Sequence, residues 1–154
     1  MTPIQQLLNE SPLLQEVQVS GWVKTFRSNR FIALNDGSCL GNLQCVVDFE
    51  NMEESLLRRI TTGTALSVRG TLVESQGRGQ SVEVQVRELE VLGDADPEQY
   101  PIQPKKHSME FLREQAHLRV RTNTFGAVMR LRSALSFAVH HYFTSRGFYN
   151  FHAP

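Results

Sequence analysis

Apolar side chains alternate with polar ones along five short runs between Val17 and Val91, and this period of two predicts five β-strands. The first three runs lie within VQVSGWVKTFRSNRFIALNDGSCLGNLQCVVDF, residues 17–49. The positions that define the runs are, in chain order, Val17, Val19 and Val23; Phe31–Leu34; Leu43, Cys45 and Val47; Leu66, Val68 and Leu72; and Val82, Val84 and Val86.

Irregularities are expected at three points in these strands. Gly21 lies inside the first strand and Gly70 inside the fourth, and such glycines often mark a bulge or a tight bend at the corner of a small barrel. The apolar phase of the fifth strand slips after Arg87, which also predicts a bulge.

A short helix is predicted between the third and fourth strands, beginning at Asn51 and ended by Gly63. Five strands with a helix after the third have the element order of the OB-fold barrel. This mainly β fold binds oligonucleotides or oligosaccharides on the face of its second and third strands. Another small antiparallel barrel with a packing helix is the alternative that the pattern leaves open.

Four segments are expected along the chain. Residues 1–14 form a short helix with Thr2 as its N-cap and Pro3 at its first position. Residues 15–93 form the barrel, and residues 94–107 form a hinge or linker because an acidic run and three prolines oppose regular structure. Residues 108–154 carry helices and begin a further domain, with Ser108 as a helix cap.

The longest helix is predicted from Phe125 to about Arg146, starting at Thr122 or Asn123 and stopped by Gly147. Residues 148–154, FYNFHAP, are expected to begin a strand. The apolar face of the helix is too wide for the residues that follow to cover. We therefore expect a second copy, or further chain of a longer protein, to cover it, with the first domain as the alternative.

Charge separates the chain into two parts of opposite sign. Residues 1–104 carry eight Lys and Arg against fourteen Asp and Glu, whereas residues 105–154 carry eight against two. This asymmetry suggests two units with different partners and argues against a broad phosphate-binding surface on the first unit. No apolar run is long enough to span a membrane and no secretory signal is present, so a cytoplasmic location is expected.

Phe31 and Gln44 are the first candidates for a binding site. If Ile32 and Leu34 fill the barrel, Phe31 points outward and offers a platform on which a base can stack. Gln44 is out of phase with Leu43 and Cys45, so its amide should also face outward and reach a base edge. The alternatives are a reversed phase that buries Phe31 and a glutamine that is merely solvated.

Arg27 and Glu83 are the second pair of candidates. Arg27 can present a fork of donors to a base or phosphate, and Glu83 can accept from a base amino group. Each is otherwise an ordinary solvated charge, and the glycine-rich loop Ser75–Gln80 is expected only to turn. No catalytic constellation and no metal-ligand spacing is found among the histidines and the two cysteines.

Several stretches together resemble asparaginyl-tRNA synthetases. GWVKTFRS, FIALNDGSC, LQCVVDF and TTGTALSVRGTLVES are similar to their anticodon-binding OB domain. YPIQPKKHSMEFLREQAHLRVRTNTFGAVMRLRSAL is similar to the hinge and first catalytic-domain helix, and RGFYNFHAP to class II motif 1. The resemblance implies an OB barrel, a linker, and the truncated start of an α+β class II catalytic domain that includes motif 1.

The resemblance also implies roles for individual residues. Phe31, Gln44 and Arg27 would surround the central uridine of the tRNA(Asn) anticodon, and Glu83 would contact the first anticodon base. Motif 1 makes a homodimer interface in this family. The resemblance therefore implies that Val128, Leu131, Leu135 and Pro154 contact a second copy.

The parent enzymes activate asparagine with ATP and Mg²⁺ through motifs 2 and 3, which lie beyond Pro154. No cofactor is expected in this chain, and the purified 154-residue chain is expected to form no adenylate, which an adenylate-formation assay can check. A free-standing module that binds tRNA or single-stranded nucleic acid, without ligase activity, is the alternative. A protein that only oligomerises through motif 1 is a third alternative.

Overall fold

The computed structural model describes residues 1–11, 13–77 and 79–152. It separates the chain into two compact units, Met1–Met109 and the residues from Glu110 onward. Each unit is described by itself.

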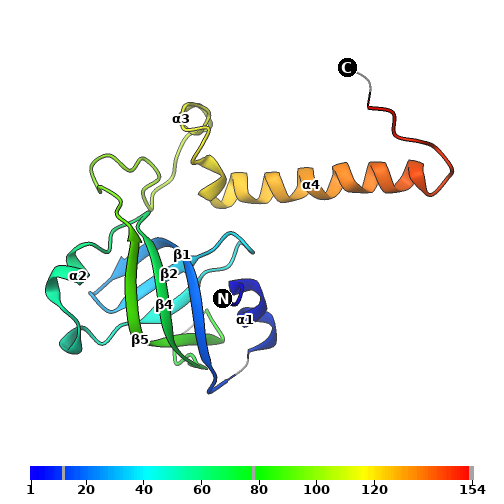
Figure 1. The fold of residues 1–154 in the computed structure, drawn as a ribbon. Coiled ribbons are helices and arrows are strands. Elements are labelled where there is room, and N and C mark those ends of the chain that lie inside the picture. Colours follow the sequence, from blue (N-terminus) through cyan, green and yellow to red (C-terminus); the bar gives the residue numbers. More distant parts are fainter. Residues whose placement is uncertain (12, 78, 153–154) are drawn as a thin grey trace. The chain divides into compact units, whose positions relative to one another are not determined.

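Five strands form the first unit and close into a barrel (Figure 1). They are β1 (Glu16–Arg27), β2 (Phe31–Asn35), β3 (Leu43–Val46), β4 (Ala65–Glu74) and β5 (Val82–Gly93). Their order around the barrel is β1-β2-β3-β5-β4, with β4 returning to β1. All neighbours are antiparallel except β3 and β5, which run parallel. The five predicted strands and the OB-fold order are confirmed.

The interior of the barrel contains the apolar positions that the period of two predicted. Val19, Ile32, Leu34, Leu66 and Val84 are completely buried. Because each buried apolar side chain contributes about 1.5–3 kcal/mol, this interior is the main favourable term in the stability of the unit. The remaining barrel residues of the same cluster are Val17, Val23, Leu43, Cys45, Val47, Val68, Leu72, Val82 and Val86.

The predicted bulge in the fifth strand is present at Arg87. This residue has no strand-pairing partner on β4, because it lies between the pairs Arg69↔Glu88 and Gly70↔Val86. The bulge in β1 lies at Lys24, between Val23↔Leu34 and Thr25↔Ala33, and not at Gly21. Gly21 serves a different purpose, because a Cβ there would collide with the Asn35 carbonyl. A glycine at this position lets two strands approach closely.

Helix α1 (Ile4–Glu10) places Ile4 and Leu7 in the core of the barrel. The prediction that Thr2 caps this helix is wrong, because the N-cap position is Pro3 and carries no side-chain cap bond. The capping acceptors come instead from the loop after β2. Asp36 Oδ2 accepts from Ile4 N at 2.8 Å, and Ser38 Oγ accepts from Gln5 N at 3.0 Å.

The helix between β3 and β4 is shorter than predicted. A 3₁₀ turn, η1 (Phe49–Asn51), precedes α2 (Glu54–Arg58), whose N-cap is Glu53. Met52 is extended, with φ −113° and ψ 147°, and it separates the two elements, so the helix does not begin at Asn51. Gly63 lies in a turn beyond α2, where its φ of +95° favours glycine.

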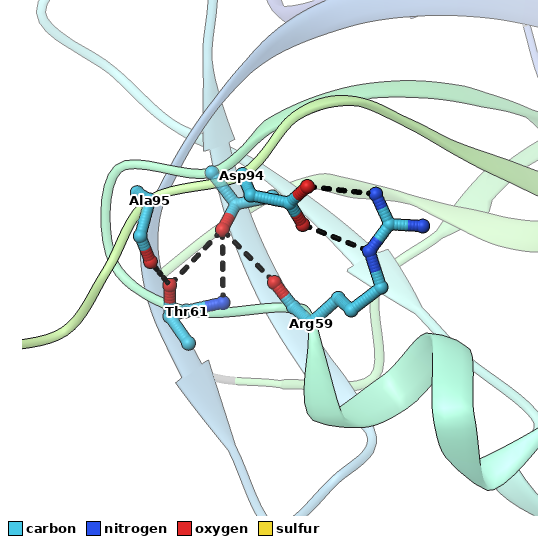
Figure 2. A network of polar contacts seen from close by, with 5 residues as sticks. Arg59, Thr61, Asp94 and Ala95 are labelled. Atoms are coloured by element: carbon cyan, nitrogen blue, oxygen red, sulfur yellow. Dashed lines mark hydrogen bonds and ion pairs between the residues drawn. The ribbon is translucent and has the colours of Figure 1, made fainter.

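A polar network ties the end of β5 to the segment between α2 and β4 (Figure 2). Arg59 Nε and one terminal nitrogen each donate to Asp94 at 2.8 Å, and Thr61 Oγ1 donates to the Ala95 carbonyl. The ion pair lowers the pKa of Asp94 through its hydrogen bond with Arg59. The chain therefore leaves the barrel along a fixed path over its first two linker residues.

The second unit consists mainly of one long helix. The chain reaches it through α3 (Met109–Glu114) and the 3₁₀ turn η2 (Arg119–Arg121). Helix α4 (Asn123–Thr144) begins as predicted, because Thr122 Oγ1 accepts from Phe125 N. Gly147 follows with φ +84°. None of the described helices is both long and apolar enough to cross a membrane.

The predicted strand after α4 does not form in the described residues 148–152, which adopt neither helix nor strand. A β-strand requires a neighbouring strand for its backbone hydrogen bonds. No strand pairs with these residues in the described part of the chain. Ala153 and Pro154, the end of this predicted strand, lie outside the described residues.

Asp36 gives the docking of α1 a pH dependence. Burial raises the pKa of Asp36, but the hydrogen bonds from Ser38 and from the Ile4 N–H outweigh burial, so the pKa lies below its ordinary value of 3.8. Such a carboxyl stabilises the fold above its unfolded pKa, and this contribution is lost as the pH falls through the folded pKa. We expect Asp36→Asn to lower the free energy of unfolding at about pH 6 and to have almost no effect near pH 2.

Urea unfolding followed by circular dichroism at both pH values measures this difference. Glu90→Gln is the control, because Glu90 is an exposed carboxylate on β5 with no hydrogen bond or ion pair among the described residues. A loss of stability by Asp36→Asn that is equal at both pH values would contradict the assignment.

Candidate nucleic-acid interface

Strand register aligns two rows of side chains on the outer face of the barrel. Residues that are paired directly across a sheet point to the same face. The first row, from β1 through β2, β3 and β5 to β4, contains Thr25, Ala33, Gln44, Glu83 and Val73. The second row contains Arg27, Phe31, Val46, Gln85 and Thr71. All four predicted site residues therefore lie in two adjacent rows.

Phe31 is partly exposed, whereas its neighbour Ile32 is completely buried, so the predicted outward phase of β2 is confirmed. Arg27 is exposed and is the cross-strand partner of Phe31. The guanidinium of Arg30 lies 5.8 Å from the centre of the Phe31 ring. The ring thus lies beside two arginines. Their positively charged guanidinium groups can attract the electron-rich edges of bases and nearby phosphates.

Gln44 and Glu83 lie side by side, on the parallel strands β3 and β5. Gln44 Nε2 donates to Glu83 Oε2 at 3.0 Å. Gln44 is half-buried, as expected for an outward position. Glu83 is only 8% exposed, so the description of it as an ordinary solvated carboxylate does not hold.

Three further donors surround the Glu83 carboxylate. Ser75 Oγ donates to Oε2 at 2.8 Å and Gln80 Nε2 donates to Oε2 at 3.4 Å. Gln85 Nε2 donates to Oε1 at 3.2 Å. The loop from Ser75 to Gln80 therefore does more than turn the chain, since two of its side chains fix the carboxylate; Arg78 in this loop lies outside the described residues.

A hollow of about 290 Å³ adjoins the second row. Val46 and Gln85 line it from the sheet, and Arg30, Asp48 and Glu50 contribute charged groups around it. Two of these three groups are acidic, which fits the net negative charge of residues 1–104. A hollow with a mainly acidic lining is poorly suited to binding phosphates alone and better suited to contacts with bases.

Neither cysteine forms a disulfide. Burial raises the pKa of the Cys45 thiol to about 12, so Cys45 is a protonated core residue at neutral pH. In the described ranges no three His, Cys, Asp or Glu side chains are grouped so that they could hold a metal ion.

Val128, Leu131 and Leu135, which the sequence suggested as interface residues, lie on α4 and are 46%, 61% and 57% exposed. Pro154, the fourth of these residues, lies outside the described part of the chain. The helix thus presents an apolar face within its own unit, as its sequence pattern indicated.

The structure adds Arg30, Ser75, Gln80 and Gln85 to the residues chosen from the sequence. Gln85 could have been found from the sequence, because it lies two residues after Glu83 and therefore shares the same face of the strand. Ser75 and Gln80 had none, since their contact with Glu83 depends on how the loop folds back. Arg30 was hidden by its position in the turn between β1 and β2.

Comparisons with known proteins agree with this geometry. Residues 17–92 match the family described as "OB-fold nucleic acid binding domain". The chain is 53% identical to the asparagine–tRNA ligase of Parabacteroides distasonis and 54% identical to that of Bacteroides fragilis. Each alignment covers 99% of this chain and 33% of the relative. The chain therefore spans about a third of the length of the curated relatives it matches.

Solved structures show the same fold. The crystal structure of asparaginyl-tRNA synthetase from Pyrococcus horikoshii superposes with a TM-score of 0.83 at 23% identity. The superposition covers 99% of this chain and 37% of that one.

Proposed function

We propose that this chain, which matches asparagine–tRNA ligases over 99% of its length and an OB-fold nucleic acid binding domain over residues 17–92, binds the anticodon loop of tRNA(Asn). One observation carries the proposal: the register of β1, β2, β3 and β5 places Arg27, Phe31, Gln44 and Glu83 in two adjacent outward rows. An aromatic ring, an amide, a guanidinium and a carboxylate on one face are the groups that hold and read an unpaired base.

Each side chain has a distinct role in this proposal. The Phe31 ring stacks on the central uridine of the anticodon, and the Gln44 amide reads the edge of that base. Arg27, across the strand pair from Phe31, donates to a base or to a neighbouring phosphate. Glu83 accepts from the first anticodon base through the lone pairs that its donors leave free.

The segments around the barrel belong to the same proposal. We assign residues 1–14 to an N-terminal segment whose helix, α1, packs on the barrel of residues 15–93. Residues 94–107 are assigned to a linker and residues 108–154 to the start of the class II catalytic domain. We propose that Val128, Leu131, Leu135 and Pro154 contribute to a homodimer interface.

Sedimentation equilibrium of the chain is expected to show a dimer, and Leu131→Asp is expected to dissociate it. A monomeric wild-type chain would contradict this interface.

The activity of the whole protein is a proposal of the same kind. A ligase of this family would activate asparagine with ATP and Mg²⁺ and then acylate the tRNA. The described residues would supply tRNA binding to that reaction and none of its chemical steps. A cytoplasmic location, where the tRNA substrate is found, is part of the same proposal.

Binding to anticodon stem-loops tests the proposed function. The chain is expected to bind an asparagine-tRNA anticodon stem-loop with a central uridine more tightly than a loop with that base changed. Phe31→Ala is expected to weaken binding about tenfold, because one base–aromatic stack is worth about 1–3 kcal/mol. Fluorescence anisotropy at two salt concentrations measures both effects.

Phe137→Ala is the matched control, since Phe137 is an exposed phenylalanine, 73% accessible, on α4. It should leave binding to the loop unchanged. Tight binding without base preference and with a steep salt dependence would assign the affinity to the basic residues after Lys105 and not to the barrel. Absence of binding to either loop would overturn the proposal for this chain.

A further inference from the structure

The Glu83 carboxylate accepts hydrogen bonds from four side chains and pairs with none of the described cations. Gln44, Ser75 and Gln80 donate to Oε2, and Gln85 donates to Oε1. Three of the four donors are primary amides. Oε2 thus accepts three hydrogen bonds. Because Glu83 is only 8% exposed, a donor that turned away from Oε2 would lose a hydrogen bond that water could not readily replace.

This arrangement fixes the orientation of the Gln44 amide. An amide has a donor end and an acceptor end, and a carboxylate can only accept. If the Gln44 amide were reversed, its carbonyl oxygen would face the Glu83 carboxylate and the two acceptors would repel. The NH₂ group must therefore face β5, and Oε1 lies on the opposite side of the amide, away from Glu83.

The side chain paired directly with Gln44 on that opposite side offers no competing donor. The cross-strand neighbour of Gln44 on β2 is Ala33, whose side chain carries no polar group. Phe31 lies two residues from Ala33 on the same face of β2. Among the hydrogen bonds of the described residues, Gln44 Oε1 accepts none. A base stacked on Phe31 would therefore meet Gln44 as an acceptor.

We propose that Glu83 is a positioning residue that acts through Gln44: it holds the amide so that the site selects a base with an imino N–H, uracil and not cytosine, at the position Gln44 reads. N3 of uracil carries a hydrogen that Oε1 can accept, whereas N3 of cytosine is itself an acceptor and is repelled. This inference rests on the proposed function, because it assumes that an anticodon base occupies the Phe31 face. It assigns Glu83 a part in reading the central base, in addition to any contact with the first.

A ratio of two affinities tests the inference. The full chain is titrated with anticodon stem-loops that carry U or C at the central position, at one salt concentration. The wild type is expected to prefer U about tenfold, the scale of discrimination by one base contact. In Glu83→Gln the amide of residue 83 can face Gln44 with either end, so the preference should fall to within about twofold of equality.

The ratio separates this role from other effects of the substitution. Removing a carboxylate or a contact with the first base changes the affinity for both loops equally, and the ratio cancels that change. Glu90→Gln removes an exposed carboxylate from the same strand and should keep the wild-type ratio. Gln44→Ala should abolish the preference, and adding Glu83→Gln to it should change the ratio no further.

Several outcomes would overturn the inference. A wild-type chain that binds both loops equally, or a Glu83→Gln variant that is folded and keeps the preference for U, would exclude it while leaving anticodon binding intact. Binding of neither loop would instead remove the proposed function on which it rests.

A measurement on the wild type alone keeps the test valid if Glu83→Gln does not fold. NMR of the free chain should show a nuclear Overhauser effect between the Gln44 side-chain NH₂ and the Glu83 γ-methylene protons. The NH₂ protons should also exchange slowly with water, because they are hydrogen-bonded in a half-buried site. Rapid exchange without this contact would overturn the fixed orientation of the amide.

Discussion

The parallel pairing of β3 with β5 is the constraint on which the rest of the barrel unit depends. It closes the sheet between two strands that are separated in the chain by α2 and β4. It also brings Gln44 beside Glu83, although the two residues are 39 positions apart. Without this pairing the sheet would have two open edges, and the amide and the carboxylate would have no reason to meet.

The interior and the outer face follow from the same register. Where Gln44 and Glu83 point outward, their neighbours Cys45 and Val84 point inward and are completely buried. Apolar burial therefore holds the polar pair in place, because a shift of one residue would exchange the two faces and expose the core. The positions of the polar side chains on the outer face are thus a consequence of the packing beneath it.

Much of this arrangement was predictable from local patterns. The alternation along β2 offered an outward Phe31 as one of two phases, and the phase slip after Arg87 located the bulge in β5. The cap of α4 was narrowed to Thr122 or Asn123 from their position before an apolar helix, and Thr122 is the cap. These features depend on side chains a few residues apart, whose spacing alone sets the periodicity, the cap or the bulge.

Two of the errors share one physical origin, which is the presence or absence of contacts between distant segments. Asp36 and Ser38 cap α1 from a loop more than thirty positions away, so Thr2 is not needed as a cap. The predicted strand after α4 lacks a pairing partner in the described residues, and a strand cannot form by itself.

The sequence by itself determined the five strands and the division of each into two faces, because alternation is a local property. It left two phases open for β2, and the structure decided that Phe31 points outward. Only the tertiary structure decided that Glu83 is buried among Gln44, Ser75, Gln80 and Gln85. Hydrogen bonds between separate strands and loops depend on barrel closure, which no local spacing encodes.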